Sequence, residues 1–427
     1  MADAFPNRAT IEARQLAQLR ALLAAILPAN PFQNRRLAET NPLAPIDSLN
    51  EFTRRHQFTT KDDLVADQSA QPPYGSNLTF EFENYTRCHQ TSGTRGIPLR
   101  WLDTPDDWQW MLGSWRQVYR SAGITAADRI YFAFSFGPFL GFWTAFEAAE
   151  QLGCLCLPGG GLSSVARLRA ILDQQATVLC CTPTYAIHLA QTAAMEKVDL
   201  TKSAVQRIIV AGEPGGSVPA TRRRIESLWP GARVSDHHGM TEVGPVSYEC
   251  PANAGTLHII ESAYFAEVVN PTTGESIAPG ETGELILTTL GRTGSPLLRY
   301  RTGDRVKPAA SIPCSCRSHE LALVGGILGR TDDMIIVRGV NIHPAAIDEM
   351  ISHHGGVAEY QARLTTHAAM AELSLLIEPA TGVDADSLKA EIERALQESF
   401  QLRIPVSITP AGSLPRFEMK AQRWVKE

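Results

Sequence analysis

The segment TSGTRGIP, from Thr91 to Pro98, gathers hydroxyl-bearing residues and glycines into one short turn. Backbone amides and side-chain hydroxyls in such a turn can surround the oxygens of a phosphate group. The segment lacks the Lys-Ser/Thr ending of a Walker loop, and taken alone it is explained equally well as a surface turn. Interpreted as a phosphate loop, it supplies binding groups from Thr91, Ser92, Gly93, Thr94 and Gly96.

Cysteine and histidine form a second candidate site. The chain has eight cysteines, and metal binding or burial must explain them because a chain of this size in a reducing compartment needs no disulfide framework. Cys250 and His258 flank one loop, while Cys314 and Cys316 lie in the turn SIPCSCRS. These four residues can hold a structural zinc ion (Zn²⁺), although the spacings differ from common zinc fingers and free thiols are the alternative. Four further cysteines lie in apolar runs and are expected to be buried: Cys154, Cys156, Cys180 and Cys181.

The charge balance argues against nucleic acid as a partner. The chain carries 39 basic and 45 acidic residues, a net charge of -6, whereas phosphate backbones are bound by clustered lysine and arginine. A local run, Arg222 to Arg224, is expected to lie on a solvated helix face. The N-terminal residues have neither a basic start followed by an apolar run nor a small-residue cleavage site, so we expect a cytoplasmic protein.

One apolar segment needs a separate interpretation. Tyr131 to Ala149 is long, aromatic and nearly uncharged, so its length alone would allow a membrane span. However, Gly137-Pro138 interrupts it and Glu147 lies within it. We predict a buried strand YFAFSF, a turn and a packed helix from near Phe139, and no membrane partner.

The surrounding elements must position these candidate residues. A length of 427 residues favours two or three domains at roughly 150 residues each. From about residue 85, short apolar runs alternate with helical segments, which is typical of parallel sheets covered by helices. Strands are predicted at 205–211 and 232–236, with a helix at 218–228 between them. Because ligands gather at the carboxyl ends of such strands, the segments just after them are candidate site loops.

The two ends of the chain differ from this middle part. An amphipathic pattern at residues 11–27 predicts a helix that packs on the main body. GELILTTL and PLLRYRTGD are typical of antiparallel structure, and a strand ELSLLIEP, a helix from Asp384 to about Phe400 and IPVSITP indicate a small α+β unit. The predicted fold class is therefore α/β. Residues 1–329 form a large N-terminal domain with helix-covered β-sheets and a small β subdomain, and residues 330–427 form a small C-terminal α+β domain.

The phosphate loop is followed by other recognisable segments in a fixed order. They are AGEPGG (211–216), HHGMTEVG (237–244), YRTGD (300–304), GRTDDMIIVRGVNIHP (329–344) and PRFEMK (415–420). This ordered set resembles the adenylate-forming (acyl-CoA synthetase) enzymes from about residue 85 to the end. The short length, AGEPGG and GVNIHPAAID are most similar to the phenylacetate-CoA ligase branch. The resemblance implies an aryl-CoA ligase that converts a carboxylate and ATP to acyl-AMP and pyrophosphate, and then forms the thioester with coenzyme A.

The resemblance also implies roles for individual residues. Adenylation brings a carboxylate to the α-phosphate of ATP, and because both are anions the site must supply positive charge and an in-line approach. The position of Glu242 holds magnesium (Mg²⁺), Thr241 contacts the α-phosphate, and Asp304 accepts hydrogen bonds from the ribose. The structural alternatives are a surface loop acid for Glu242 and a turn-forming residue for Asp304.

Further positions complete the predicted ATP site. His238 replaces the aromatic residue that usually stacks on adenine, and an imidazole can stack but also titrates. Ile97 stands where lysine is frequent, so ATP affinity is expected to be lower although activity should survive. By resemblance, the remaining nucleotide-binding residues are Glu213, Pro214, Gly239, Met240 and Arg330.

The C-terminal domain is implied to be mobile and to serve both half-reactions. The resemblance makes Lys420 the catalytic lysine, whose ammonium bridges the substrate carboxylate and the α-phosphate, instead of a solvated tail charge. Asp332 matches the hinge about which this domain turns. After rotation the lysine leaves, and the segment RGVN moves in to shape the path of the pantetheine thiol. This segment comprises Arg338, Gly339, Val340 and Asn341.

Aromatic residues suggest the class of acid. The predicted acyl pocket is lined by Phe136, Phe139 and Gly141, with Ala211, Gly212 and His237 near its floor. Aromatic walls favour a flat aryl acid over a long acyl chain, although ordinary core packing is the alternative for the phenylalanines. The candidate acids are phenylacetate, benzoate and an aminobenzoate such as anthranilate.

The expected partners are thus a small aromatic carboxylic acid and coenzyme A. An enzyme that passes its acyl group to a carrier-protein thiol or an amine is the alternative, because only the thiol-binding surface differs. A non-catalytic nucleotide-binding protein is disfavoured by the presence of Glu242, Asp304 and Lys420 together. A homodimer is left open by the sequence.

Overall fold

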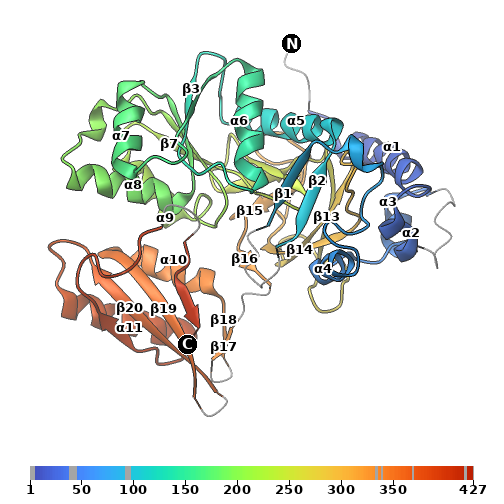
Figure 1. The fold of residues 1–427 in the computed structure, drawn as a ribbon. Helices are drawn as coiled ribbons and strands as arrows, with labels where there is room; N and C mark the ends of the chain where they lie inside the picture. The colour runs from blue at the N-terminus through green and yellow to red at the C-terminus, as the bar shows by residue number, and fades with distance from the viewer. Residues whose placement is uncertain are drawn as a thin grey trace.

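The computed structural model describes residues 5–37, 46–91, 98–331, 335–337, 340–367, 370–417 and 421–426. Its centre is a five-stranded parallel sheet in the order β4-β3-β5-β6-β7 (Figure 1). The predicted strands at 205–211 and 232–236 are confirmed as two neighbours in this sheet. The five strands are β3 (Arg129–Phe132), β4 (Leu155–Pro158), β5 (Val178–Cys181), β6 (Arg207–Val210) and β7 (Arg233–Asp236).

Helices cover both faces of the parallel sheet, because side chains of a strand alternate between its two faces. Ile130 and Phe132 of β3 join one apolar cluster, with residues of α5 and α6. Tyr131 joins the other cluster, with residues of α7, α8 and α9. The predicted helix at 218–228 is confirmed as α9. The bounds are α5 (Pro105–Ser121), α6 (Leu140–Leu152), α7 (Ser164–Asp173), α8 (Pro183–Met195) and α9 (Pro219–Leu228).

Antiparallel sheets lie to one side of this α/β unit (Figure 1), and β13 and β14 confirm the antiparallel structure predicted for GELILTTL and PLLRYRTGD. One has the order β12-β13-β14-β16, a second β10-β11-β15, and two are the pairs β1-β2 and β8-β9. The bounds are β1 (Arg87–Gln90), β2 (Arg100–Asp103), β8 (Gly239–Met240), β9 (Gly244–Pro245), β10 (Ser247–Glu249), β11 (Thr256–Ile259), β12 (Tyr264–Val269), β13 (Gly283–Thr289), β14 (Tyr300–Val306), β15 (Ala322–Val324) and β16 (Gly329–Arg330).

The N-terminal helices pack on the antiparallel part. The helix predicted at 11–27 is confirmed as α1, which packs Leu19, Leu22 and Ile26 against Leu290 and Leu298. In the part of the chain that the structure describes, three more short helices follow α1, and two 3₁₀ turns lie further along. Their bounds are α1 (Arg8–Ile26), α2 (Pro31–Leu37), α3 (Leu49–Arg55), α4 (Lys61–Ala70) and the 3₁₀ turns η1 (Phe82–Asn84) and η2 (Leu200–Lys202).

The C-terminal part has its own apolar core. Its sheet has the order β21-β20-β19-β22, and its helix α11 begins after Asp384, whose side chain accepts a hydrogen bond from Ser387 N. In Figure 1 this orange-red unit lies below the green α/β unit, with α10 towards α9. The bounds are β17 (Ile335–Val337), β18 (Val340–Ile342), α10 (Pro344–His354), β19 (Val357–His367), β20 (Met370–Pro379), α11 (Ala385–Phe400), β21 (Val406–Ile408) and β22 (Trp424–Lys426). The boundary at residue 330 stays a prediction; β16 still pairs with β14.

The segment Tyr131 to Ala149 contains the end of β3, a loop and most of α6, which confirms the predicted helix from near Phe139. The strand predicted over YFAFSF is shorter than expected, because β3 ends at Phe132 and residues 133–136 are loop. Among the described residues, no helix is long and apolar enough to cross a membrane. One prediction about charge was wrong. Arg222 is not on a solvated face: its guanidinium donates to the carbonyls of Gly216 and Val234 and pairs with Glu249. Its side chain is only 11% exposed, because α9 packs against β7 and the guanidinium reaches Glu249 of β10.

Candidate active site

The predicted site loops leave the parallel sheet at the same edge. Phe132, Cys181, Val210 and Asp236 are the last or nearly the last residues of their strands, and neighbouring strand ends pair in register. The turn that follows β6 passes very close to β7, since a Cβ at Gly216 would lie 2.5 Å from the Asp236 carboxylate. The segments that begin at 133, 211 and 237 therefore converge at the carboxyl edge, where α/β proteins bind ligands.

The predicted ribose residue, Asp304, contacts two other predicted nucleotide residues. His238 Nε2 lies 2.9 Å from Asp304 Oδ2, and Arg330 Nη1 donates to Asp304 Oδ1 at 3.2 Å. Burial alone would raise the pKa of Asp304, but His238 and Arg330 outweigh it and hold that pKa below its ordinary value. A side chain at Gly303 would meet the Arg330 guanidinium at 2.6 Å, so the β14 turn needs glycine there. Asp304 is thus a buried carboxylate, not an exposed turn residue.

Glu242 is buried as well, at 6% exposure, which excludes a surface loop acid. Its Oε1 lies 3.6 Å from Lys61 Nζ of α4. Burial and Glu242, which hydrogen-bonds the Tyr300 hydroxyl, raise the pKa of that tyrosine. Gly239 and Met240, just before it, pair with Gly244 and Pro245 in a short hairpin. A Cβ on Gly239 would lie 2.9 Å from the Gly244 carbonyl oxygen, so this close pairing requires glycine.

Arg292 was not predicted from the sequence, and its guanidinium holds the backbone of Thr241 and Glu242 by hydrogen bonds. Its Nη1 donates to the carbonyl oxygens of Thr241 at 3.0 Å and Glu242 at 2.8 Å, and its Nε donates to Asp103 Oδ1 at 2.7 Å. Both charged side chains are 0% exposed. Asp103 ends β2, so this pair connects the hairpin around the phosphate loop to the predicted magnesium segment. Its local sequence, LGRTG, resembles a turn and contains no signal of burial.

The ends of the predicted phosphate loop are fixed. Thr91 N donates to the Leu99 carbonyl at 2.9 Å, and Leu99 N donates to Thr91 Oγ1 at 3.0 Å. Gln90 N donates to the Pro138 carbonyl at 2.8 Å, which ties the hairpin to the aromatic segment. The other predicted phosphate-loop residues lie outside the described part of the chain: Ser92, Gly93, Thr94 and Gly96, together with Ile97.

The predicted acyl pocket contains a neutral histidine. His237 packs against Trp115 of α5 at 4.3 Å between ring centroids, and its Nδ1 lies 2.6 Å from the Ser247 carbonyl oxygen. Burial lowers the pKa of His237 to about 4, so the ring is uncharged near pH 7. Sequence reasoning missed Trp115, because the amphipathic pattern of α5 explains it as core. Ala211 is half-buried and Gly212 is exposed.

The aromatic segment after β3 packs largely on itself. The Phe136 ring meets Trp143 at 4.9 Å and Phe146 at 5.4 Å, both edge to face. Phe134 stacks on Phe142. Phe139 precedes the first residue of α6, and Gly141 is exposed in its first turn. Phe134 belongs to the apolar core, and Phe136, Phe142, Trp143 and Phe146 pack against that core beside the carboxyl edge. Their part in an acyl pocket stays a prediction.

Glu213 contacts both parts of the chain. Its Oε1 accepts a hydrogen bond from Thr184 N, and its Oε2 accepts one from Ala421 N, each at 2.8 Å. The neighbouring Pro214 is exposed. Four other predicted residues lie outside the described residues: Asp332, Arg338, Gly339 and Lys420. Val340 and Asn341 belong to β18, which pairs with β17.

The predicted zinc residues converge although they are far apart in sequence. Cys250 Sγ lies 3.7 Å from Cys314 Sγ, and Cys316 Sγ lies 3.4 Å from His258 Nε2. All four ligand atoms lie within 4.8 Å of one another. Zn–S bonds of about 2.3 Å and Zn–N bonds of about 2.0 Å separate tetrahedral ligand atoms by about 3.5–3.8 Å, so the set fits one ion. Of the remaining cysteines discussed above, Cys154, Cys180 and Cys181 are buried and Cys156 is partly so.

Similarity to known proteins shows the family of this chain. Residues 91–291 match the AMP-binding enzyme family, and residues 339–427 match the AMP-binding enzyme C-terminal domain. Phenylacetate-coenzyme A ligase of Thermus thermophilus is 30% identical, over 96% of this chain and 95% of its own length. That of Escherichia coli (strain K12) is 31% identical, over 88% of this chain and 86% of its own. The chain belongs to the phenylacetate-CoA ligase family. It is thus an AMP-forming acid-CoA ligase, which uses ATP and coenzyme A and acts through an acyl-AMP intermediate.

Solved structures of a related CoA ligase distinguish between arrangements of the two parts. 2-Hydroxyisobutyryl-CoA ligase in the postadenylation state is 26% identical, matches 99% of this chain and 91% of that chain, and has a TM-score of 0.92. The thioesterification state of the same enzyme, with coenzyme A, gives a TM-score of 0.75 over the same shares. The arrangement of the present ligase is therefore more similar to the postadenylation state.

Proposed function

We propose that this ligase activates an aromatic carboxylic acid, of the size of phenylacetate, benzoate or anthranilate. The observation that carries the proposal is the aromatic wall of Phe136, Trp143 and Phe146 beside the carboxyl edge of the parallel sheet. A flat ring gains from edge-to-face contacts with such a wall. The neutral His237 next to Trp115 adds a floor with no charge, which suits an apolar ring.

A small aliphatic acid is the strongest competitor. The related ligase in the postadenylation state, with a TM-score of 0.92, holds a 2-hydroxyisobutyryl adenylate, whereas the phenylacetate-CoA ligases have the higher sequence identities. A branched hydroxy acid needs a polar partner for its hydroxyl and fills far less volume than an aryl group. The two acids therefore make opposite demands on the aromatic wall, and a direct comparison of rates separates them.

In the adenylation step, buried acidic groups of the large domain would orient ATP. Asp304, held charged by His238 and Arg330, is suited to accept two hydrogen bonds from ribose hydroxyls. The carboxylate of Glu242 is a hard oxygen ligand of the type that magnesium prefers, and its Lys61 partner at 3.6 Å can be displaced by a divalent cation. Bound magnesium would neutralise phosphate charge. Thr241, braced through its carbonyl by Arg292, would present its hydroxyl to the α-phosphate.

The C-terminal part would supply the group that completes adenylation. We assign to Lys420 the bridging of carboxylate and α-phosphate, to Asp332 the hinge, and to Arg338, Gly339, Val340 and Asn341 the path of the thiol. These roles rest on the ordered motifs. The higher TM-score to the postadenylation state than to the thioesterification state supports a C-terminal domain docked for the first half-reaction.

A structural zinc ion is part of the proposal. The donor set of three thiols and one imidazole, with ligand atoms within 4.8 Å, suits tetrahedral zinc better than magnesium or calcium, which prefer oxygen. The site lies in the β10-β11-β15 region. Four protein ligands leave zinc no open position for a substrate, so its effect is expected on stability and not on the chemical step.

The proposed function is tested by pyrophosphate release with a panel of acids, with and without coenzyme A. Phenylacetate, benzoate and anthranilate should react faster than 2-hydroxyisobutyrate and a long fatty acid. Faster reaction of 2-hydroxyisobutyrate would refute the aromatic assignment. Pyrophosphate release without a thioester product would favour transfer to a carrier-protein thiol or an amine. Sedimentation of the purified protein tests the homodimer that the sequence left open.

Lys420→Ala tests the division of labour between the half-reactions. The variant should lose adenylation almost completely, because the removed ammonium stabilises charge at the transition state, where one such contact is worth about 10²–10³ in rate. It should still form thioester from a supplied acyl-adenylate. Equal losses in the two half-reactions would contradict alternation of the C-terminal domain.

A further inference from the structure

The carboxylate of Glu213 joins the two parts of the chain, a contact that its place in the AGEPGG motif does not predict. The resemblance implied a wall of the adenine pocket, yet each carboxylate oxygen accepts a hydrogen bond from a backbone amide, one on each side of the junction between the two parts of the chain. Thr184 N is the donor in the large domain and Ala421 N is the donor in the C-terminal part, each at 2.8 Å. Both oxygens of the carboxylate are therefore engaged in holding backbone.

The contact on the large-domain side is dictated by the start of α8. Helices leave the amides of their first turn without intrahelical partners. In α8, Pro183 has no amide hydrogen and Tyr185 N donates to the Thr182 side chain. The amide of Thr184 remains, and Glu213 Oε1 accepts from it. A negative charge at this end is also favoured by the helix dipole, so the carboxylate is oriented before the second contact is made.

The contact on the other side belongs to a short stretch that leads into β22. Ala421 lies three residues before Trp424, and Arg423 O accepts from Ala362 N of β19, so the stretch is tied to the C-terminal sheet. Glu213 also helps to raise the pKa of Asp348 in α10, after the larger effect of burial. Glu213 therefore interacts with Ala421 by a hydrogen bond and with the carboxyl group of Asp348 through its charge.

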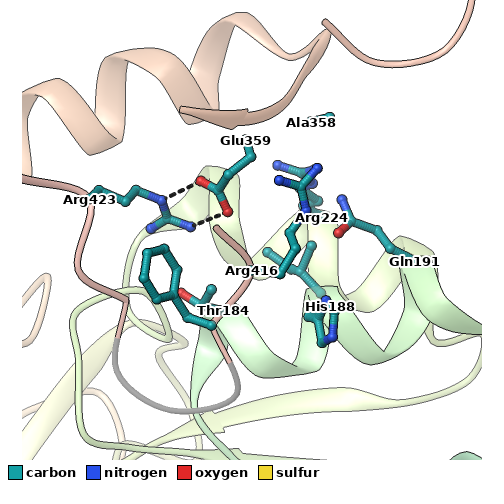
Figure 2. A pocket seen from close by; sticks show the side chains of 10 residues that line it. Thr184, His188, Gln191, Arg224, Ala358, Glu359, Arg416 and Arg423 are labelled. Carbon is teal, nitrogen blue, oxygen red and sulfur yellow. Dashed lines mark hydrogen bonds and ion pairs between the residues drawn. The ribbon is translucent and has the colours of Figure 1, made fainter. Parts of the chain in front are cut away.

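Most residues of the pocket beside the Thr184 contact are polar or charged (Figure 2). Thr184, His188 and Arg224 line it from the large domain, and Glu359 and Arg423 line it from the C-terminal part. Polar surfaces of this kind can separate in water at little cost in exposed apolar area. Thr184 belongs both to this pocket and to the Glu213 contact, and the hydrogen bond from Ala421 to Glu213 exists only while Ala421 is docked.

We infer that Glu213 is a positioning residue for adenylation, which fixes the backbone beside Lys420 when the C-terminal domain is docked as seen here. The inference rests on the proposed role of Lys420. Consecutive Cα atoms are about 3.8 Å apart, so an anchor at Ala421 restricts the positions open to the preceding residue. When the domain turns for thioester formation, the Ala421 contact is released while the Thr184 contact remains. Glu213 therefore acts in one half-reaction only.

The test compares Glu213→Gln and Glu213→Ala with the wild-type enzyme in each half-reaction. The amide of glutamine has one oxygen, so it can cap Thr184 or accept from Ala421 but not do both with full strength. Adenylation, measured by pyrophosphate exchange, should fall about 10-fold in the Gln variant and up to about 100-fold in the Ala variant, because small misplacements of catalytic groups cost this much. The KM for ATP should change less than about twofold. Thioester formation from a supplied acyl-adenylate should stay at the wild-type rate.

A matched control lies at the other end of the same helix. Glu196 caps the C-terminal end of α8 and is exposed, so Glu196→Gln should leave both half-reactions unchanged. A raised KM for ATP with retained kcat would overturn the inference in favour of adenine binding. Equal losses in both half-reactions, or unchanged adenylation in both Glu213 variants, would also overturn it.

A measurement without turnover separates this inference from the proposed function. Hydrogen exchange at the amides of Thr184 and Ala421 should become roughly tenfold faster in Glu213→Ala, because their acceptor is removed. Unchanged exchange at Ala421 would refute the anchor. If the wild-type enzyme showed no pyrophosphate exchange with any acid, the proposed function would fail instead. The hydrogen-exchange rate at Ala421 would still decide whether Glu213 holds that residue.

Discussion

Two polar regions of this ligase hold active-site segments in place, and they are built in opposite ways. In the large domain, Arg292 and Asp103 are both 0% exposed, and the guanidinium also binds two carbonyl oxygens. At the junction with the C-terminal part, Arg224 of the large domain faces Glu359, which pairs with Arg423 of its own part, and the Arg423 side chain stays 22% exposed. The first region is fully buried, whereas the second remains partly exposed.

The difference follows from what each region must do. A buried pair that loses one partner leaves an unpaired charge, and this costs about 3–5 kcal/mol. Exposed pairs contribute about 0–1 kcal/mol, because water and salt replace them easily. A brace beneath Thr241 and Glu242 has to stay fixed through the reaction, whereas a domain that turns between half-reactions needs contacts that are cheap to break. The comparison predicts a decreasing series of effects.

The largest effect is expected for Arg292→Met. Asp103 would be left buried and unpaired, and the carbonyls of Thr241 and Glu242 would lose their donor. The free energy of unfolding should fall by about 3–5 kcal/mol, as measured by urea denaturation. A loss below about 1 kcal/mol would mean that the buried region is no firmer than the junction.

A double variant separates the fold from the chemistry of this brace. Arg292→Met combined with Asp103→Leu replaces the pair by apolar side chains, which often restores stability. We expect the unfolding free energy to recover while adenylation stays reduced, because nothing then holds the two carbonyls. Recovery of both properties would show that the pair serves stability alone.

The zinc residues should extend the fixed region. Cys314→Ser removes one of four ligands and should lower bound zinc to well below one ion per chain in metal analysis, with a lower melting temperature. The exposed Cys88 offers a matched control, and Cys88→Ser should keep the metal. Full zinc content in Cys314→Ser would exclude the proposed ligand set.

The fixed region should also carry a pH dependence. Burial lowers the pKa of His237 to about 4, below the ordinary value near 6.5. The folded state therefore favours the neutral imidazole over the protonated one. This contribution to the free energy of unfolding is present above about pH 6.5 and is lost as the pH falls towards 4. The loss is on the order of 3 kcal/mol.

The measurement is the difference in unfolding free energy between the wild-type protein and His237→Gln across this pH range. The variant lacks the titrating ring, so the difference should shrink steadily from pH 7 to pH 4, while titration of all other groups cancels. The exposed His354→Gln is the control and should show a constant difference. A constant difference for His237→Gln would mean that the ring is not buried in its neutral form.

The contrast between the two regions also explains what could be predicted from the sequence. The strands at 205–211 and 232–236 and the helix between them were predicted because apolar periodicity reports burial of local elements. The zinc residues were predicted as a set from residue type. Their convergence follows from the β10-β11 pairing, which brings Cys250 near His258, and from the β11-β15 pairing, which places the segment with Cys314 and Cys316 beside them. Neither Arg292 nor Glu213 could be assigned its contact, because each depends on carbonyls or amides of distant segments that a local pattern does not contain. Arg222 was misjudged for the same reason.

The smallest effect is expected at the junction, for Arg224→Ala. Burial lowers the pKa of Arg224, and Glu359 across the face partly offsets this. Removal of this guanidinium should weaken docking by no more than about 1 kcal/mol and slow adenylation less than about fivefold. The loss should be smaller at high salt, because salt screens the same attraction in the wild-type enzyme. The neighbouring Arg223 is exposed on the same helix, so Arg223→Ala is the matched control and should have no effect. Arg224→Ala would act like Arg292→Met only if the junction were a permanent interface. An equal fall in the unfolding free energy would therefore contradict a domain that turns between half-reactions, because each turn would cost about 3–5 kcal/mol.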